Sequence, residues 1–111
     1  MNEQTYKEFV NSLFKEFPTE IETMLHAGIG ISGEAGEILD ALKKTWVYNK
    51  PLDRDNLIEE LGDLLFYAQK LADIMGLELW QVMLLNRKKL QKRYPTGAYT
   101  DLHAQERLDK K

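Results

Sequence analysis

Cysteine is absent from this 111-residue sequence, which excludes both a disulfide framework and a thiolate metal site. No apolar run approaches the roughly 18 to 20 residues that span a bilayer, and the polar N-terminus lacks the apolar segment of a signal peptide. The net charge is −3, whereas nucleic-acid-binding domains usually carry a basic surplus. We therefore expect a soluble cytoplasmic protein with neither a membrane nor a nucleic acid as its partner.

Several catalytic motifs are also missing. There is no G-x-S-x-G nucleophile elbow and no P-loop, and the glycine-rich stretch GIGISG follows no predicted strand, as a dinucleotide-binding fingerprint would. The histidines are His26 and His103, and neither follows a glutamate by three positions. This excludes the Glu-x-x-His pattern of carboxylate-bridged di-iron bundles.

Proline is scarce and divides the chain into helical segments. Pro18, Pro51 and Pro95 separate stretches whose apolar residues recur with helical spacing, and no useful β-type alternation is found. The predicted helices cover residues 3–16, 19–46, 53–76 and 78–93, with a short helix or disorder in the tail. We therefore expect an all-α fold, an antiparallel bundle of about four main helices that is completed by oligomerisation.

Local signals mark the ends of these predicted helices. Thr19 and Glu22 have the spacing of a capping box, Asp53 or Asp55 can cap the third helix, and Gly76 suits its C-terminal end. The glycines at positions 28 and 30 predict an irregularity within the second helix.

Four carboxylates are placed unusually on two of these helices. On a helical wheel, Glu34 and Glu37 lie at the rim of the apolar face of the second helix, and Glu60 and Asp63 do so on the third. The neighbouring Glu59 points away. Both pairs have i, i+3 spacing and enclose a glycine, in GEAGE and ELGD.

Basic and amide side chains follow on the fourth helix. Asn86, Lys89 and Arg93 fall inside its apolar arc, within the run NRKKLQKR, and Lys44 lies two turns beyond Glu37. These side chains would suit a phosphate chain.

Inward carboxylates require a counter-charge. Two like charges 4 Å apart repel by roughly 4 kcal/mol at an effective dielectric constant of 20. All-oxygen ligation is typical of hard cations, chiefly Mg²⁺ with Mn²⁺ as the alternative, and Mg²⁺ commonly shares its ligand shell with phosphate. The enclosed glycines then predict helices that approach closely and leave room for metal, water and substrate.

A simpler interpretation stays open at this point. A single Glu-x-x-Glu on a helix is most often a solvated face. The chain could instead be a non-enzymatic helical oligomer or regulatory module, in which Glu60 or Asp63 forms interhelical salt bridges with Lys89 or Arg93.

The segments GEAGEILDALKK, EELGDLLFYAQKLAD and NRKKLQKRYPTG resemble the MazG-like all-α nucleotide pyrophosphohydrolases, in particular short single-domain members of bacterial and phage type. The resemblance covers roughly residues 21–97, so a MazG-like domain over 1–97 and a C-terminal tail over 98–111 are expected. The family signature, E-x-x-E followed by E-x-x-D, matches Glu34, Glu37, Glu60 and Asp63, with 22 residues between Glu37 and Glu60.

The resemblance implies Mg²⁺-dependent hydrolysis of nucleoside triphosphates, or their deoxy forms, to the monophosphate and pyrophosphate. It implies that the four acidic residues are metal ligands and that a residue of the first pair is the catalytic base. Asn86, Lys89 and Arg93 become phosphate contacts, and the protein is expected to be a homodimer or a tetramer.

Two further points follow from the resemblance. Many members carry another glutamate where this chain has Gly33, so the choice between Glu34 and Glu37 as the base stays open. Tyr67, one turn after Asp63, is expected to contact the nucleoside, and His26 is a second candidate for this contact. A modified nucleotide or a guanosine alarmone is the alternative substrate.

Overall fold

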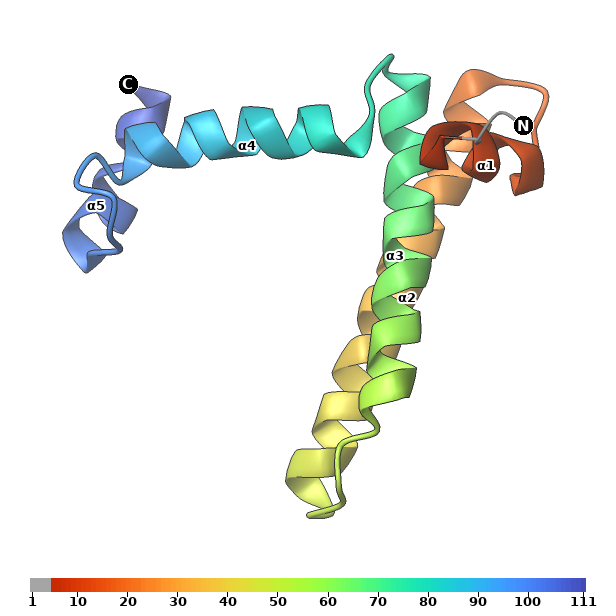
Figure 1. Ribbon diagram of the computed structural model, residues 1–111, viewed down its shortest axis with the longest axis horizontal. Coiled ribbons are helices and arrows are strands. Elements are labelled where there is room, and N and C mark those ends of the chain that lie inside the picture. Colours follow the sequence, from red (N-terminus) through yellow and green to blue (C-terminus); the bar gives the residue numbers. More distant parts are fainter. Residues whose placement is uncertain (1–4) are drawn as a thin grey trace. The chain divides into compact units, whose positions relative to one another are not determined.

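A computed structural model describes residues 5–111, which form α1 (Tyr6–Leu13), α2 (Glu20–Val47), α3 (Arg54–Ile74), α4 (Leu79–Arg93), α5 (Asp101–Glu106) and a 3-10 helix, η1 (Leu108–Lys110) (Figure 1). The described residues contain no strand, so the predicted all-α class is confirmed. Contacts divide the chain into two compact units, and the boundary between them along the sequence lies between Leu77 and Glu78. The predicted domain boundary at residues 97 and 98 stays a prediction.

The first unit is built on a long antiparallel hairpin of α2 and α3, which pack side by side (Figure 1). α2 begins as predicted, because the Thr19 hydroxyl accepts a hydrogen bond from the Glu22 N–H at 3.3 Å and donates one to the Glu22 carboxylate at 2.7 Å. The helix then continues without interruption to Val47. The irregularity predicted at the glycines of positions 28 and 30 was therefore wrong: the cost of about 1 kcal/mol for a glycine within a helix does not interrupt α2.

A short loop joins the two helices of the hairpin. Asn49 adopts a left-handed conformation with a φ of 52°, which asparagine tolerates better than most residues. Asp53 caps α3 by accepting a hydrogen bond from the Asn56 N–H at 3.1 Å. Gly76, with a φ of 78°, follows the last turn, and its N–H donates to the Asp73 carbonyl at 2.9 Å. Both predicted ends of α3 are thus confirmed.

The core lies at the end of the hairpin where α1 packs. Val10, Phe14 and Ala27 are buried there, and Phe66, Tyr67 and Leu71 of α3 pack against them. The prediction that the first helix extends to residue 16 was wrong, because Phe14 already has extended backbone angles and turns its ring into this core. Residues 3 and 4 of that prediction lie outside the described residues.

A buried lysine ties α1 to the hairpin. Lys70 of α3 donates hydrogen bonds to Asn11 Oδ1 at 2.9 Å and to Glu16 Oε1 at 2.6 Å. Its ammonium also lies 5.3 Å from the centroid of the Phe14 ring. The buried charge is therefore paired and hydrogen-bonded, as its burial requires.

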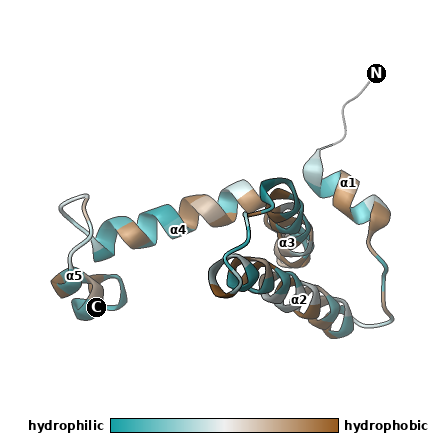
Figure 2. Ribbon diagram, turned by 90° about the horizontal axis from the view of Figure 1, so that it is seen from below, coloured by the Kyte–Doolittle hydropathy of each residue, from teal (hydrophilic) through white to brown (hydrophobic). Residues whose placement is uncertain are grey.

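Many large apolar side chains of the hairpin are exposed. Figure 2 shows hydrophobic residues along α2, and the exposed side chains of the two helices include Ile21, Leu25, Ile29, Leu39, Leu42, Trp46, Ile58, Leu61 and Leu65. Leu61 and Leu65 are about half exposed, so the apolar face of α3 is wider than the surface that α2 and α1 cover. No helix in the described part of the chain is long and apolar enough to cross a membrane.

The second unit contains α4, α5 and η1. Its helices are joined by Asp109, whose side chain is fully buried and accepts hydrogen bonds from the guanidinium groups of Arg93 at 3.0 Å and Arg107 at 3.3 Å. The short helix expected at 101–108 is present as α5 and ends at Glu106.

Candidate functional site

Three carboxylates from the two helices of the hairpin converge. One oxygen each of Glu34, Glu37 and Glu60 lie within 4.8 Å of one another. The i, i+3 spacing presents Glu34 and Glu37 on one side of α2, and packing of the hairpin brings Glu60 of α3 against them. The structure thus joins three of the four acidic residues that the sequence singled out.

Among residues 5–111, no lysine or arginine forms an ion pair with this cluster. Glu34 Oε2 and Glu60 Oε2 are buried without a hydrogen-bond partner among the described residues. Hydrogen bonding to the Glu60 carboxyl and repulsion from its charge raise the pKa of Glu37. Contact with the Glu34 carboxyl similarly raises the pKa of Glu60. Unpartnered carboxylate oxygens are the donors that a hard divalent cation takes, so the residues present fit such an ion.

Asp63 stands apart from the other three acidic residues. Its side chain is exposed, and it does not belong to the group of oxygens that converge. It is still close enough that its charge contributes to raising the pKa of Glu37 and of Glu60. Its predicted role as a metal ligand is therefore not supported by the cluster itself and stays a prediction.

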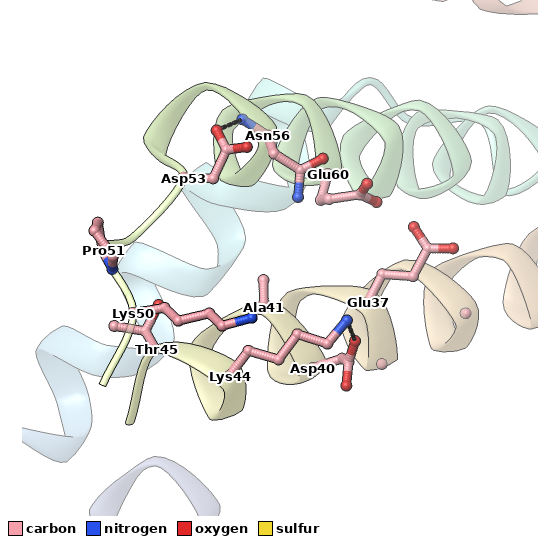
Figure 3. A pocket seen from close by; sticks show the side chains of 12 residues that line it. Glu37, Asp40, Ala41, Lys44, Thr45, Lys50, Pro51, Asp53, Asn56 and Glu60 are labelled. Atoms are coloured by element: carbon pink, nitrogen blue, oxygen red, sulfur yellow. Dashed lines mark hydrogen bonds and ion pairs between the residues drawn. The ribbon is translucent and has the colours of Figure 1, made fainter. Parts of the chain in front are cut away.

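A cavity of about 530 Å³ opens beside the cluster, toward the loop between α2 and α3 (Figure 3). Glu37 and Glu60 lie on its wall, together with Lys44, Lys50 and Asn56. Lys44, a predicted phosphate contact, forms an ion pair with Asp40 at 2.8 Å. The volume is within the range of about 300 to 1,000 Å³ that is typical of small-molecule sites.

The prediction that the helices approach closely at the glycines beside the carboxylates was wrong. A Cβ atom on Gly33, Gly36 or Gly62 would meet no heavy atom within 4 Å, so the helices do not approach closely there. Gly33 and Gly36 instead line the cavity. The close approach occurs one turn earlier, where a Cβ on Gly30 would overlap the ring of Tyr67.

The two predicted nucleoside contacts lie together in an aromatic cluster. The ring centroids of His26 and Tyr67 are 6.2 Å apart, and His26 also packs edge-on against Phe14 at 5.1 Å and Phe17 at 5.0 Å. His26 Nδ1 is buried without a hydrogen-bond partner among the described residues. An aromatic face with one unpartnered polar atom is therefore present, at the end of the hairpin where α1 packs.

Comparison with known proteins decides the family. The model of the MazG nucleotide pyrophosphohydrolase domain matches residues 21–98, which include the converging glutamates and Asp63. The chain belongs to the MazG nucleotide pyrophosphohydrolase family. It is also 36% identical over 81 residues to the Gene 37 protein of Mycobacterium phage L5, across 69% of this chain and 71% of that protein. No solved structure matches the chain.

The MazG match extends through α4, where three phosphate contacts were predicted. Asn86 and Lys89 are exposed, whereas Arg93 donates hydrogen bonds to Asp109 from both Nε, at 3.0 Å, and Nη2, at 3.2 Å. Arg93 is thus already paired with an acidic residue within its own unit. The roles of these three side chains stay predictions.

Sequence reasoning missed several polar residues of the cavity, among them Asn56 and Lys50. Asn56 lies one helical turn before Glu60, so the spacing that identified Glu60 could also have found it. Lys50 lies in the loop, where helical periodicity carries no information. Its only signal is its position next to Pro51 at the end of the hairpin that holds the carboxylates.

Proposed function

We propose that this MazG-family protein hydrolyses nucleoside triphosphates, or their deoxy forms, between the α and β phosphates, giving the nucleoside monophosphate and pyrophosphate. The observation that carries the proposal is the convergence of Glu34, Glu37 and Glu60 within 4.8 Å, with unpartnered buried oxygens. These three residues, with Asp63, are proposed to hold Mg²⁺, for which Mn²⁺ can substitute. The family match supports the reaction class.

The carboxylates are proposed to activate the water molecule that attacks the α phosphorus. Bound Mg²⁺ would supply positive charge that lowers the pKa of a water molecule and offsets the charge of the phosphates. Glu34 or Glu37 accepts the proton of the water as its oxygen forms a bond to the α phosphorus. The bond between that phosphorus and the bridging oxygen breaks, and pyrophosphate leaves with the electron pair.

Other side chains are proposed to bind the rest of the substrate. Lys44, Lys89, Arg93 and Asn86 would contact phosphate oxygens and stabilise the charge that accumulates on the leaving group. Tyr67 and His26 would contact the nucleoside. The packing of these two rings within 6.2 Å supports a shared role.

The protein is also proposed to act as a homo-oligomer, a dimer or a tetramer. The support is the row of exposed apolar side chains on both helices of the hairpin, such as Leu25, Leu39 and Ile58. Soluble monomers rarely expose large contiguous apolar patches. We therefore propose that a second copy of this chain packs against these side chains.

A product assay tests the proposed function. The purified protein is incubated with a panel of ribo- and deoxynucleoside triphosphates, with and without Mg²⁺, and pyrophosphate and orthophosphate are measured separately. Mg²⁺-dependent pyrophosphate release is expected. Orthophosphate in its place would move the cleavage site and refute the proposal. A modified nucleotide and a guanosine alarmone complete the panel, and no release from any compound would favour a non-enzymatic oligomer.

A further inference from the structure

We propose that Lys50, in the loop between α2 and α3, binds the terminal phosphates of the substrate and so forms the pyrophosphate end of the site. The inference rests on the proposed function and adds a residue and a direction to it. The phosphate chain would extend from the glutamate cluster toward the loop, and the nucleoside would lie on the opposite side of the cluster.

The cavity joins Lys50 to the carboxylates. Glu37 and Glu60 contribute to its wall from the side of the cluster, and Lys50 and Pro51 contribute to it from the loop. Figure 3 shows the Lys50 side chain reaching from the loop toward Ala41 of α2. A group held by the carboxylates can thus continue toward the lysine ammonium within one cavity.

The charged groups of the cavity differ in whether they are already satisfied. Lys44 is paired with Asp40 at 2.8 Å, and the Asp53 carboxylate caps α3. Lys50 forms no ion pair with any residue that the structure describes, and its ammonium lies 5.9 Å from the centroid of the Tyr48 ring. Lys50 can therefore bind an anion without first giving up an ion pair with a described residue, and an ammonium group next to a divalent-metal site complements a phosphate.

The backbone of the loop restricts where Lys50 can lie. It is preceded by Asn49 with its left-handed φ of 52° and followed by Pro51, whose ring restricts the backbone. A restrained loop loses less conformational entropy when its side chain binds a ligand. The loop is thus suited to hold a cation at the mouth of the cavity.

The order of residues along α3 gives the direction of the substrate. Asn56 precedes Glu60 by one turn and lines the cavity, whereas Tyr67 follows Glu60 by seven residues, or about 10 Å at 1.5 Å per residue. Tyr67 packs with His26 in the aromatic cluster near α1. The polar cavity and the aromatic cluster are therefore on opposite sides of the carboxylates, as the two ends of a nucleotide require.

Calorimetric titration tests the inference with pyrophosphate and a nucleoside monophosphate, both in the presence of Mg²⁺. Lys50→Gln is expected to weaken pyrophosphate binding about tenfold or more, the effect of losing one charge-assisted contact, and to leave monophosphate binding unchanged. Lys43→Gln is the matched control, because Lys43 is a nearby exposed lysine that does not line the cavity. Lys50→Arg should retain most of the affinity.

Binding of Mn²⁺, followed by electron paramagnetic resonance, should be unchanged in Lys50→Gln, which shows that the carboxylate cluster is intact. Equal pyrophosphate affinity in the wild type and in Lys50→Gln would overturn the inference. A loss of monophosphate affinity as large as the loss of pyrophosphate affinity would also overturn it, and so would a wild type that binds no pyrophosphate. The proposed hydrolysis is judged separately by turnover of the wild type. If the wild type hydrolyses the substrate and Lys50→Gln binds pyrophosphate as tightly as the wild type does, only the role of Lys50 is refuted.

Discussion

Glu34, Glu37 and Glu60 bring three negative charges together, and this has opposite consequences for stability and for function. Without a cation, the proximity of the carboxyl groups raises the pKa of Glu37 and of Glu60, which means that the charged forms are disfavoured in the folded protein. With a divalent cation, the same oxygens become ligands. The stability of the protein should therefore depend strongly on the metal.

Glu60→Gln separates these two effects. Removing one charge should raise the melting temperature of the metal-free protein slightly, and removing one ligand should abolish most of its stabilisation by Mg²⁺. For the wild type, Mg²⁺ at 100 times its dissociation constant should add about 2.7 kcal/mol to the free energy of unfolding. Turnover of Glu60→Gln should fall by about 100-fold or more, the scale for losing one preorganised charge-stabilising group. Thermal melts with and without Mg²⁺ and a pyrophosphate assay measure these changes.

Glu59→Gln is the control for this prediction, since Glu59 is an exposed neighbour outside the cluster. It should keep both the Mg²⁺ stabilisation and the turnover of the wild type. A Glu60→Gln variant stabilised by Mg²⁺ as much as the wild type would show that Glu60 is not a ligand.

At the scale of elements, the contact between Gly30 and Tyr67 sets how closely α2 and α3 approach one turn before Glu34. The absence of a side chain at position 30 lets the aromatic ring lie against the backbone of α2. A change in the distance between α2 and α3 at this contact is expected to change the distance between the carboxylates, because Glu34 and Glu60 belong to the same two helices.

Gly30→Ala should destabilise the fold by about 1 to 3 kcal/mol, the usual range for overpacking, and should weaken Mn²⁺ binding. Gly28→Ala is the matched control, since its Cβ would meet nothing within 4 Å. Alanine is the better helix former by up to about 1 kcal/mol, so this control should be neutral or stabilising. Chemical denaturation and Mn²⁺ titration measure both effects, and a Gly30→Ala variant as stable as Gly28→Ala would contradict the proposed role of the contact.

The attachment of η1 to α4 depends on Asp109. Hydrogen bonds from Arg93 and from Arg107 hold the pKa of Asp109 well below its usual range. A lowered pKa means that charged Asp109 stabilises this contact above the pKa of the unfolded chain, about 3.9, and that this stabilisation is lost as the pH falls below that value.

Asp109→Asn should therefore loosen residues 107–111 at pH 7, and its difference from the wild type should become smaller at pH 3. Amide NMR spectra of this segment at the two pH values measure the effect. Asp101→Asn is the control, because Asp101 accepts a single hydrogen bond from the Tyr99 hydroxyl. An Asp109→Asn spectrum identical to that of the wild type at pH 7 would contradict the account.

The helices were largely predictable because their ends depend on local chemistry. Asp53, Thr19 and Gly76 act at the positions where their side-chain and backbone preferences place them. The end of α1 was not predictable in this way, since Phe14 leaves the helix to pack in a core formed by residues distant in the sequence.

At the scale of the whole molecule, the exposed apolar side chains of the hairpin are the basis of the proposed homo-oligomer. Ile58→Lys should shift the protein toward a monomer, because Ile58, Leu61 and Leu65 lie at helical spacing and are all exposed. Glu59→Lys introduces the same side chain one position away and should leave the oligomer intact. Light scattering after gel filtration distinguishes the two, and a wild type that is monomeric would refute the oligomer.

The site was only partly predictable from the sequence, because helical periodicity gives the direction of a side chain but not its distance from residues of another helix. A helical wheel can place Glu34, Glu37 and Glu60 at the rim of their helices, and packing of the hairpin does the rest. A helical wheel cannot give the distance that leaves Asp63 outside the cluster, and it cannot locate Lys50 in a loop. The close approach of the helices was assigned to the wrong glycines, because sequence spacing does not say which glycine faces the neighbouring helix.

The most direct test of the central claim is a single-turnover hydrolysis of a preferred nucleoside triphosphate in ¹⁸O-labelled water with Mg²⁺, followed by mass spectrometry of the products. Attack at the α phosphorus predicts one labelled oxygen in the nucleoside monophosphate and none in the pyrophosphate. Label in the pyrophosphate, which would mean attack at the β phosphorus, would contradict the account, as would release of orthophosphate in place of pyrophosphate.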